Sequence, residues 1–328
     1  MFSALLMRYY AGQAMNITGE AMMRDENMGP YRNSYVYTRK EPIGVCGLIT
    51  PWNYPMLMTA FKVAPMIASG CTGVHKTPEN TPLSSLRMVE LWHEIDGVVP
   101  GVLNAVPGYG NEAGEALINH DGVRKIAFTG STATGRHLQK CAADTMKRVS
   151  LELGGKGPLI IFADADLPKA IATATASGLL NSGQFCGAAT RIIVEESVYD
   201  QVVEGMAEAF RQEKMGYWRE DGSTKGPVIS ESQMSKILGY IESGKAEGAR
   251  LVTGGNRIDR PGFYVEPTLF ADCTRDMKIV KEEIFGPVIS VIKFKGGEDS
   301  VQNALDVAND SRFGLIGGVF TSDRSKAN

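Results

Sequence analysis

Short apolar runs alternate with longer helix-like stretches throughout the first half of the chain. Apolar runs of roughly four to eight residues, bounded by glycine or proline, are typical of strands buried on both faces of a parallel sheet. They predict strands over 43–50, 72–76, 102–106, 123–128 and 147–153, with helices over 55–69, 83–95 and 111–119 and a further helix after Gly135. Strands that alternate with helices in this way indicate βαβ units and a parallel sheet.

The second half of the chain repeats this alternation. It predicts strands over 158–162, 191–195, 251–253, 264–270, 287–294 and 317–320, and helices over 168–180, 198–215 and 232–247. The pattern therefore predicts the α/β class, with one unit over 1–153 and a second over 154–328. Ahead of the first sheet, residues 1 to about 23 predict a helix, and 33–41 predict a strand that ends at Pro42.

Composition narrows the class of protein. At 328 residues, with 43% hydrophobic and 22% charged residues, the chain suits an ordinary globular protein of about two domains. The net charge of −3 gives no basic field, which argues against nucleic acid or an anionic membrane as a partner. No apolar run approaches the roughly 18 residues of a membrane span, and the short apolar start lacks the features of a signal peptide.

The five cysteines are odd in number and scattered along the chain. No CxxC pair or Cys/His cluster shows the spacing of a metal site, so neither disulfides nor a bound metal are predicted. A reducing, cytoplasmic compartment is the simplest expectation.

One cysteine, Cys186, lies among small and turn-forming residues in the stretch 181–191, between a predicted helix and a predicted strand. Free cysteine commonly packs as a small apolar residue, so a buried packing role is one reading. The flanking glycines let backbone or ligand come close, so a nucleophile is the other. The stretch alone leaves both readings open.

A second stretch with two readings is 128–135, where Gly130 and Ser131 follow a predicted strand. Such a turn aims backbone N–H groups and a helix N-terminus at a point where a phosphate could bind. Glycine is also the usual residue of an ordinary tight turn, and the GxGxxG pattern is absent.

Six short blocks together resemble the NAD(P)-dependent aldehyde dehydrogenase superfamily, in the family's order and over nearly the whole chain. The likeness is to its non-phosphorylating, betaine-aldehyde dehydrogenase-like members. The blocks are Pro51-Trp-Asn-Tyr-Pro55, Lys76-Thr-Pro-Glu79, Phe128-Thr-Gly-Ser131, Leu151-Glu-Leu-Gly-Gly155, Gly183-Gln-Phe-Cys186 and Lys281-Glu-Glu-Ile-Phe-Gly-Pro287. The resemblance implies a Rossmann-like cofactor domain, a second α/β catalytic domain and part of an oligomerisation hairpin at about 30–41.

The resemblance also implies catalytic roles. Cys186 matches the nucleophile that forms a thiohemiacetal and then a thioester, and Glu152 matches the base that activates the deacylating water. Asn53 matches the amide that forms an oxyanion hole with the backbone N–H of Cys186. Lys62 matches a lysine near the base and its proton-exit waters. Without the resemblance, Glu152 and Asn53 would be read as structural residues beside turns, and Lys62 as a surface lysine.

For the cofactor, Lys76 and Glu79 match positions that contact the adenosine ribose. A carboxylate there accepts hydrogen bonds from the ribose hydroxyls and repels a 2′-phosphate, so NAD is expected rather than NADP. The alternative for Lys76 and Glu79 is an ordinary solvated charge pair. The alternative for Phe285 is a core aromatic, and the alternative for Glu283 is a solvated surface charge. The other implied cofactor contacts are Thr50, Trp52, Gly130, Ser131, Leu153, Glu283 and Phe285.

The substrate implied by the resemblance is an aldehyde that enters an apolar, partly aromatic tunnel. Such a tunnel suits aliphatic or aromatic aldehydes, and an aromatic box could also hold a trimethylammonium aldehyde by cation–π attraction. Apolar residues at helical spacing are more often core, so the substrate itself is not predicted. The implied lining residues are Tyr54, Leu57, Met58, Phe61, Leu180 and Phe185.

The chain departs from its full-length relatives, which are longer at both ends and form homodimers or homotetramers. The catalytic unit is therefore expected to be incomplete at its C-terminus, and the hairpin is expected to lack its partner strand. Two readings follow. The first is an NAD-dependent aldehyde dehydrogenase, and the second is a catalytically silent, truncated member that is a structural or binding protein or a non-functional fragment.

Overall fold

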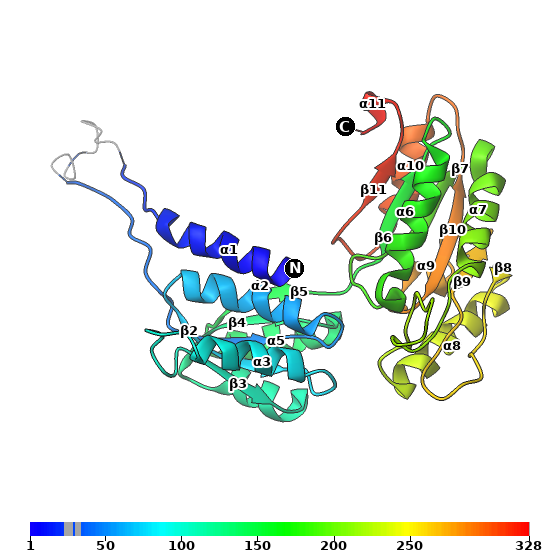
Figure 1. Cartoon of the computed structure of the whole chain (residues 1–328). Helices are drawn as coiled ribbons and strands as arrows, with labels where there is room; N and C mark the ends of the chain where they lie inside the picture. The colour runs from blue at the N-terminus through cyan, green and yellow to red at the C-terminus, as the bar shows by residue number, and fades with distance from the viewer. Residues whose placement is uncertain (23–28, 30–33, 328) are drawn as a thin grey trace. The chain divides into compact units, whose positions relative to one another are not determined.

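The computed structural model describes residues 1–22, 29 and 34–327, and the chain folds into two compact units, Met1–Leu153 and Gly154–Asn328 (Figure 1). Each unit is built around its own sheet. The α/β class, with a Rossmann-like parallel sheet and a second α/β unit, is as the sequence predicts. Among the described residues, no helix is long and apolar enough to cross a membrane.

The sheet of the first unit has five parallel strands in the order β3-β2-β1-β4-β5. The chain adds β2 and β3 on one side of β1 and then crosses to add β4 and β5 on the other. Doubly wound sheets bind ligands outside the carboxyl ends of the two strands at which the order reverses, which here are β1 and β4. The strands are β1 (Val45–Ile49), β2 (Thr72–Thr77), β3 (Leu103–Pro107), β4 (Val123–Thr129) and β5 (Arg148–Glu152).

Helices cover both faces of this sheet because successive residues of a strand point to opposite faces. Leu48 packs in a core with residues of α2 and α3, whereas Ile49 packs in a second core with residues of α4 and α5. The helices of this unit are α1 (Phe2–Gln13), α2 (Pro55–Ala68), α3 (Leu83–His93), α4 (Glu115–Asn119) and α5 (Thr132–Asp144).

The second unit holds six strands in the order β11-β6-β7-β10-β9-β8, all parallel to their neighbours except β8, which is antiparallel to β9. Alternate residues of β6 and β7 pack against α6 and α7 on one face and against α8, α9 and α10 on the other. The elements are β6 (Gly157–Ile161), α6 (Leu167–Leu179), β7 (Ala189–Glu195), α7 (Tyr199–Arg211), α8 (Glu231–Ala246), β8 (Arg250–Thr253), β9 (Thr268–Ala271), α9 (Lys278–Lys281), β10 (Val288–Phe294), α10 (Ser300–Ala308), β11 (Gly318–Phe320) and α11 (Arg324–Ala327).

Several predicted boundaries were wrong. The first helix ends at Gln13 rather than near residue 23, and a single 3-10 turn, Ala14–Asn16, follows it. The helix predicted after Gly135 begins at Thr132, because Ser131 caps it. The helix predicted over 198–215 ends at Arg211. The strand predicted over 264–270 begins only at Thr268, directly after Pro267, which has no N–H to donate to a ladder.

The predicted strand and hairpin at about 30–41 fall partly on residues 30–33, which lie outside the described residues. On either side of that gap, Ala21 and Tyr37 form an antiparallel bridge. Met22 N donates to the Val36 carbonyl (3.0 Å), and Thr38 N donates to the Glu20 carbonyl (2.7 Å). These segments therefore pair as the two arms of a hairpin would.

Candidate active site

Several of the predicted site residues of the first unit lie at the carboxyl ends of β1, β2 and β4, next to the point at which the strand order reverses. Trp52 and Asn53 follow β1, Lys76 lies near the end of β2, and Gly130 follows β4. The Trp52 carbonyl accepts a hydrogen bond from Thr81 Oγ1 (3.0 Å), which ties the turn after β1 to the segment after β2.

The turn after β4 has the shape of a phosphate cradle. Ser131 is the N-cap of α5, and its Oγ accepts a hydrogen bond from Thr134 N (3.1 Å). A Cβ on Gly130 would lie 2.5 Å from the Phe128 ring, and one on Gly135 would lie 2.5 Å from Leu153. A Cβ at either glycine would thus meet a neighbouring side chain, and the turn leads into the positive end of a 13-residue helix, which favours an anion.

Lys76 and Glu79 form an ion pair, but they are not the ordinary solvated pair. The Lys76 side chain is only 5% exposed, and its Nζ donates to Glu79 Oε2 at 3.0 Å. Although burial opposes it, hydrogen bonds from its own backbone and from Lys76 lower the pKa of Glu79. Glu79 thus has an ionised, partly exposed carboxylate that pairs with the ammonium group of the buried Lys76.

Thr50 contacts a buried histidine for which the sequence predicts no role. The His75 ring is completely buried, and its Nε2 lies 2.9 Å from Thr50 Oγ1 and 3.4 Å from Thr59 Oγ1. Burial, followed by the nearby charges of Lys62 and Lys76, lowers the pKa of His75 to about 4. A neutral imidazole therefore supports the end of β1 from inside the sheet.

Lys62 is a buried residue of α2 rather than a surface lysine. Burial lowers its pKa to about 8, while the charge of Glu152 opposes that shift. Glu152 ends β5 and is exposed on the same unit. The predicted base and the predicted proton-exit lysine are thus electrostatic neighbours.

In the second unit, half-buried Cys186 lies on a loop of unusual backbone geometry between α6 and β7. Asn181 and Ser182 have φ values of 51° and 55°, which L-residues rarely adopt. Side chains hold the loop in place, since Ser182 Oγ donates to the Gly226 carbonyl (2.7 Å). Gln184 donates to the Asn181 carbonyl (2.9 Å) and accepts from Ile229 N (2.9 Å). Strain that the surroundings over-determine in this way is typical of functional sites.

Gly154 and Gly155 join this loop to the block that contains Glu283. Glu283 Oε1 accepts a hydrogen bond from Gly155 N (3.0 Å), and a Cβ on Gly155 would lie 2.5 Å from the Cys186 carbonyl. A Cβ on Gly154 would collide with the Glu283 carboxylate. Burial raises the pKa of Glu283, so this residue is not a solvated surface charge. The paired glycines in the sequence were the available signal for this close packing.

Phe285 also has a rare backbone conformation, with φ of 59°. Gln233 Nε2 donates to its carbonyl at 2.8 Å and so holds the backbone of the block in place. The Phe285 ring is half-buried rather than a core aromatic. Glu283, Phe285 and Cys186 thus all lie on backbone that other residues of the second unit hold in place.

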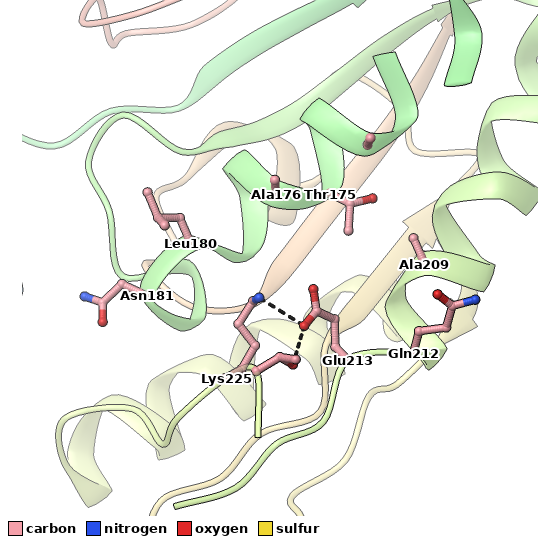
Figure 2. A pocket seen from close by; sticks show the side chains of 10 residues that line it. Thr175, Ala176, Leu180, Asn181, Ala209, Gln212, Glu213 and Lys225 are labelled. Atoms are coloured by element: carbon pink, nitrogen blue, oxygen red, sulfur yellow. Dashed lines mark hydrogen bonds and ion pairs between the residues drawn. The ribbon is translucent and has the colours of Figure 1, made fainter. Parts of the chain in front are cut away.

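Three of the predicted tunnel residues, Leu57, Phe61 and Leu180, border cavities in their own units. In the first unit, Leu57 and Phe61 of α2 line a cavity of about 320 Å³ together with apolar residues of α1. Tyr54 is the N-cap of this helix, and Met58 lies on its first turn. In the second unit, Leu180 and Asn181 border a cavity of about 500 Å³, whose opposite wall carries the Lys225–Glu213 ion pair of 3.0 Å (Figure 2). Phe185 directly precedes Cys186 on its loop.

Comparison with known proteins gives one family. The chain matches the Aldehyde dehydrogenase family over residues 2–328. It is 48% identical over 321 residues to human retinal dehydrogenase 2 and 45% identical over 322 residues to mouse "Aldehyde dehydrogenase, cytosolic 1". These matches cover 98% of this chain but only 60% and 62% of the relatives.

Solved structures agree with this result. The NAD+ complex of an aldehyde dehydrogenase from Bacillus cereus is 43% identical, with a TM-score of 0.90 over 97% of this chain and 62% of that one. The NAD+ complex of betaine aldehyde dehydrogenase from Staphylococcus aureus is 39% identical, with a TM-score of 0.91 over 98% and 63%. The chain therefore belongs to the aldehyde dehydrogenase family.

Proposed function

We propose that this chain oxidises an aldehyde to the carboxylic acid and reduces NAD, with Cys186 as the nucleophile. The observation that carries the proposal is the packing around Gly155. This residue contacts the carbonyl of Cys186 and donates its N–H to the carboxylate of Glu283. A backbone held so tightly around a half-buried thiol is an arrangement expected of a site in which atoms must be positioned.

The residues of each unit suit NAD. In the first unit, the Gly130 turn and the N-terminus of α5 would hold the pyrophosphate, and Glu79 would hold the adenosine ribose. Glu283 and Phe285 in the second unit would hold the nicotinamide ribose and ring. When bound, NAD would accept the hydride that leaves the substrate carbon. Structural relatives that are NAD+ complexes support this cofactor.

The chemical steps rest on Cys186, Asn53 and Glu152. The Cys186 thiolate attacks the aldehyde carbon, which forms a carbon–sulfur bond and places negative charge on the carbonyl oxygen. The Asn53 amide and the backbone N–H of Cys186 stabilise that oxygen. After oxidation to the thioester, Glu152 takes a proton from water, whose oxygen attacks the acyl carbon and releases the acid and the Cys186 thiolate.

Lys62 would carry the proton away from Glu152. Its pKa of about 8 is close enough to neutrality for the ammonium to form and dissociate at physiological pH. Its burial beside the charge of Glu152, in the same unit, supports this role.

The substrate is proposed only as a class. The apolar cavity bordered by Leu57 and Phe61 suits an aliphatic or aromatic aldehyde. We also propose a cytoplasmic protein that assembles as a homodimer or homotetramer, as the hairpin-like pairing of residues 20–22 with 36–38 would allow. The chain spans about 60% of the length of the relatives it matches.

The test measures NADH formation by its absorbance, with a panel of aliphatic and aromatic aldehydes as substrates. We expect turnover by the wild type and none by Cys186→Ser, with unchanged NAD binding in both. Cys141→Ser is the matched control, because Cys141 is a partly exposed thiol of the first unit outside the proposed machinery. A folded wild type that binds NAD but turns over no aldehyde would favour the silent alternative.

A further inference from the structure

Three potential metal ligands meet on the surface of the first unit, on α4 and α5. Glu115 is the first residue of α4, and His137 and Cys141 are one turn apart on α5. Residues four apart on a helix share a face, so the imidazole and the thiol point the same way. His137 Nε2 lies 2.5 Å from Glu115 Oε1 and 3.6 Å from Cys141 Sγ. One donor atom from each residue lies within 4.8 Å of the other two.

These separations are close to those of a tetrahedral zinc site. With zinc bonds of about 2.0–2.3 Å, neighbouring nitrogen and sulfur ligands lie about 3.6 Å apart, and nitrogen and oxygen ligands lie about 3.4 Å apart. Cys141 Sγ has this separation from His137 Nε2 (3.6 Å), but it also lies 3.9 Å from Nδ1, so the half-exposed imidazole has to turn before Nε2 and Sγ can share one ion. Glu115 needs to withdraw from His137 by about 1 Å. The Glu115 side chain is about one-third exposed, so a change of rotamer can supply that movement.

The donor chemistry selects the class of cation. A thiolate sulfur, an imidazole nitrogen and a carboxylate oxygen suit zinc and its softer transition-metal neighbours, whereas magnesium and calcium take oxygen ligands. His137 is more than half exposed, so water can reach the fourth coordination position. We propose that Glu115, His137 and Cys141 form a binding site for a zinc-like divalent transition-metal ion, separate from the residues proposed for catalysis.

A simpler arrangement uses the same residues, namely a surface His–Glu ion pair with a thiol beside it. The two accounts differ in what Cys141 does. In an ion pair the thiol is dispensable, whereas in a metal site it supplies the strongest of the three bonds to a zinc-like ion. The ion would also join α4, which precedes β4, to α5, which follows it.

The test uses Cys186→Ser as the parent protein, so that the proposed nucleophile cannot bind metal. Among the residues that the structure describes, the other thiols at 46, 71 and 273 are buried. Co²⁺ is titrated as a spectroscopic probe, and Zn²⁺ then competes for the site. We expect one Co²⁺ per chain, a thiolate-to-cobalt charge-transfer absorption, and a melting temperature that rises with added Zn²⁺.

Two further substitutions in the parent identify the ligands. Cys141→Ser should abolish the charge-transfer absorption, and His137→Gln should weaken binding by more than the roughly 10–100-fold that loss of an outer-shell partner costs. His120→Gln and Glu112→Gln, two exposed neighbours, should leave binding unchanged. A parent that binds no Co²⁺, or binding that survives both ligand substitutions, would overturn the proposal. Melting curves without metal establish that each variant folds.

Discussion

Replacing Lys156 by methionine should stabilise the chain near neutral pH and remove a dependence of its stability on pH. Lys156 follows the glycine pair that holds Glu283, and it is only 3% exposed. Its Nζ has no hydrogen-bond partner among the described residues. Burial, and then the charge of Arg191, lowers the pKa of Lys156 from its ordinary 10.5 to about 7, while Glu283 opposes the shift.

The magnitude follows from proton linkage. Each pH unit between the two pKa values is worth about 1.4 kcal/mol, so the full effect is about 5 kcal/mol. Because the folded pKa is the lower one, the unfolded chain binds a proton between pH 7 and 10.5 that the folded chain does not. Stability from this group therefore rises with pH across that window. Below pH 7 the lysine is charged in both states, and its destabilising effect is constant.

Urea unfolding followed by circular dichroism, at intervals from pH 7 to pH 9.5, measures this effect. We expect Lys156→Met to exceed the wild type in stability most at pH 7, with a difference that shrinks by about 1.4 kcal/mol per pH unit. Lys169→Met, at an exposed position on α6, is the control and should give a difference that does not vary with pH. A pH-independent difference for Lys156→Met, or a loss of stability at pH 7, would show that burial does not disfavour the charged form of Lys156.

Three other substitutions test single contacts. Gly155→Ala places a Cβ 2.5 Å from the Cys186 carbonyl, so kcat/KM should fall by about tenfold or more, which corresponds to ~1.4 kcal/mol or more. The control is Gly317→Ala, whose Cβ would lie at an ordinary 3.6 Å from its nearest neighbour and which should retain activity. Equal losses in both variants would show that the close contact with the Cys186 carbonyl does not matter for catalysis. Asp164→Asn removes a carboxylate that accepts from Thr321 Oγ1 (2.7 Å) and from the backbone of Ser322 and Asp323 (3.0 Å each). It should cost about 1–3 kcal/mol in urea unfolding and speed hydrogen exchange in β11, while exchange unchanged from wild type would show that the carboxylate does not hold this segment. Glu79→Ser should raise the affinity for NADP relative to NAD by about tenfold or more, as measured by fluorescence titration, and an unchanged ratio would remove Glu79 from the ribose site.

Much of the fold could be predicted from local sequence. β1 and β10 are apolar runs bounded by glycine or proline, and these signals do not depend on distant residues. The helix α10 was not predicted, although it buries Ala304 and Val307 against the second sheet. Its sequence is half polar and only nine residues long, so its stability comes from tertiary packing rather than from a strong local pattern.

The candidate site shows a sharper limit. The matching sequence blocks indicated Cys186 and Glu283, but only the fold shows that Gly155 lies against both. Gly155 and Glu283 are 128 residues apart in the sequence. A sequence motif also does not show whether a residue is buried. Nothing in the sequence distinguishes Lys62 and Lys156 from surface lysines, yet both side chains are buried. The cluster on α4 and α5 was missed because Glu115 is 22 residues from His137, and His137 and Cys141 alone form only half of a metal-ligand pattern.

The proposed mechanism requires that Cys186 becomes acylated and that Glu152 releases the acyl group. The most direct measurement is mass spectrometry of Glu152→Gln after incubation with NAD and an aldehyde that the wild type oxidises. We predict that the peptide containing Cys186 gains the mass of the acyl group, and that hydroxylamine, which cleaves thioesters, removes it. An acyl group on another cysteine, or no acyl group in a variant that still forms NADH in the first turnover, would contradict the account.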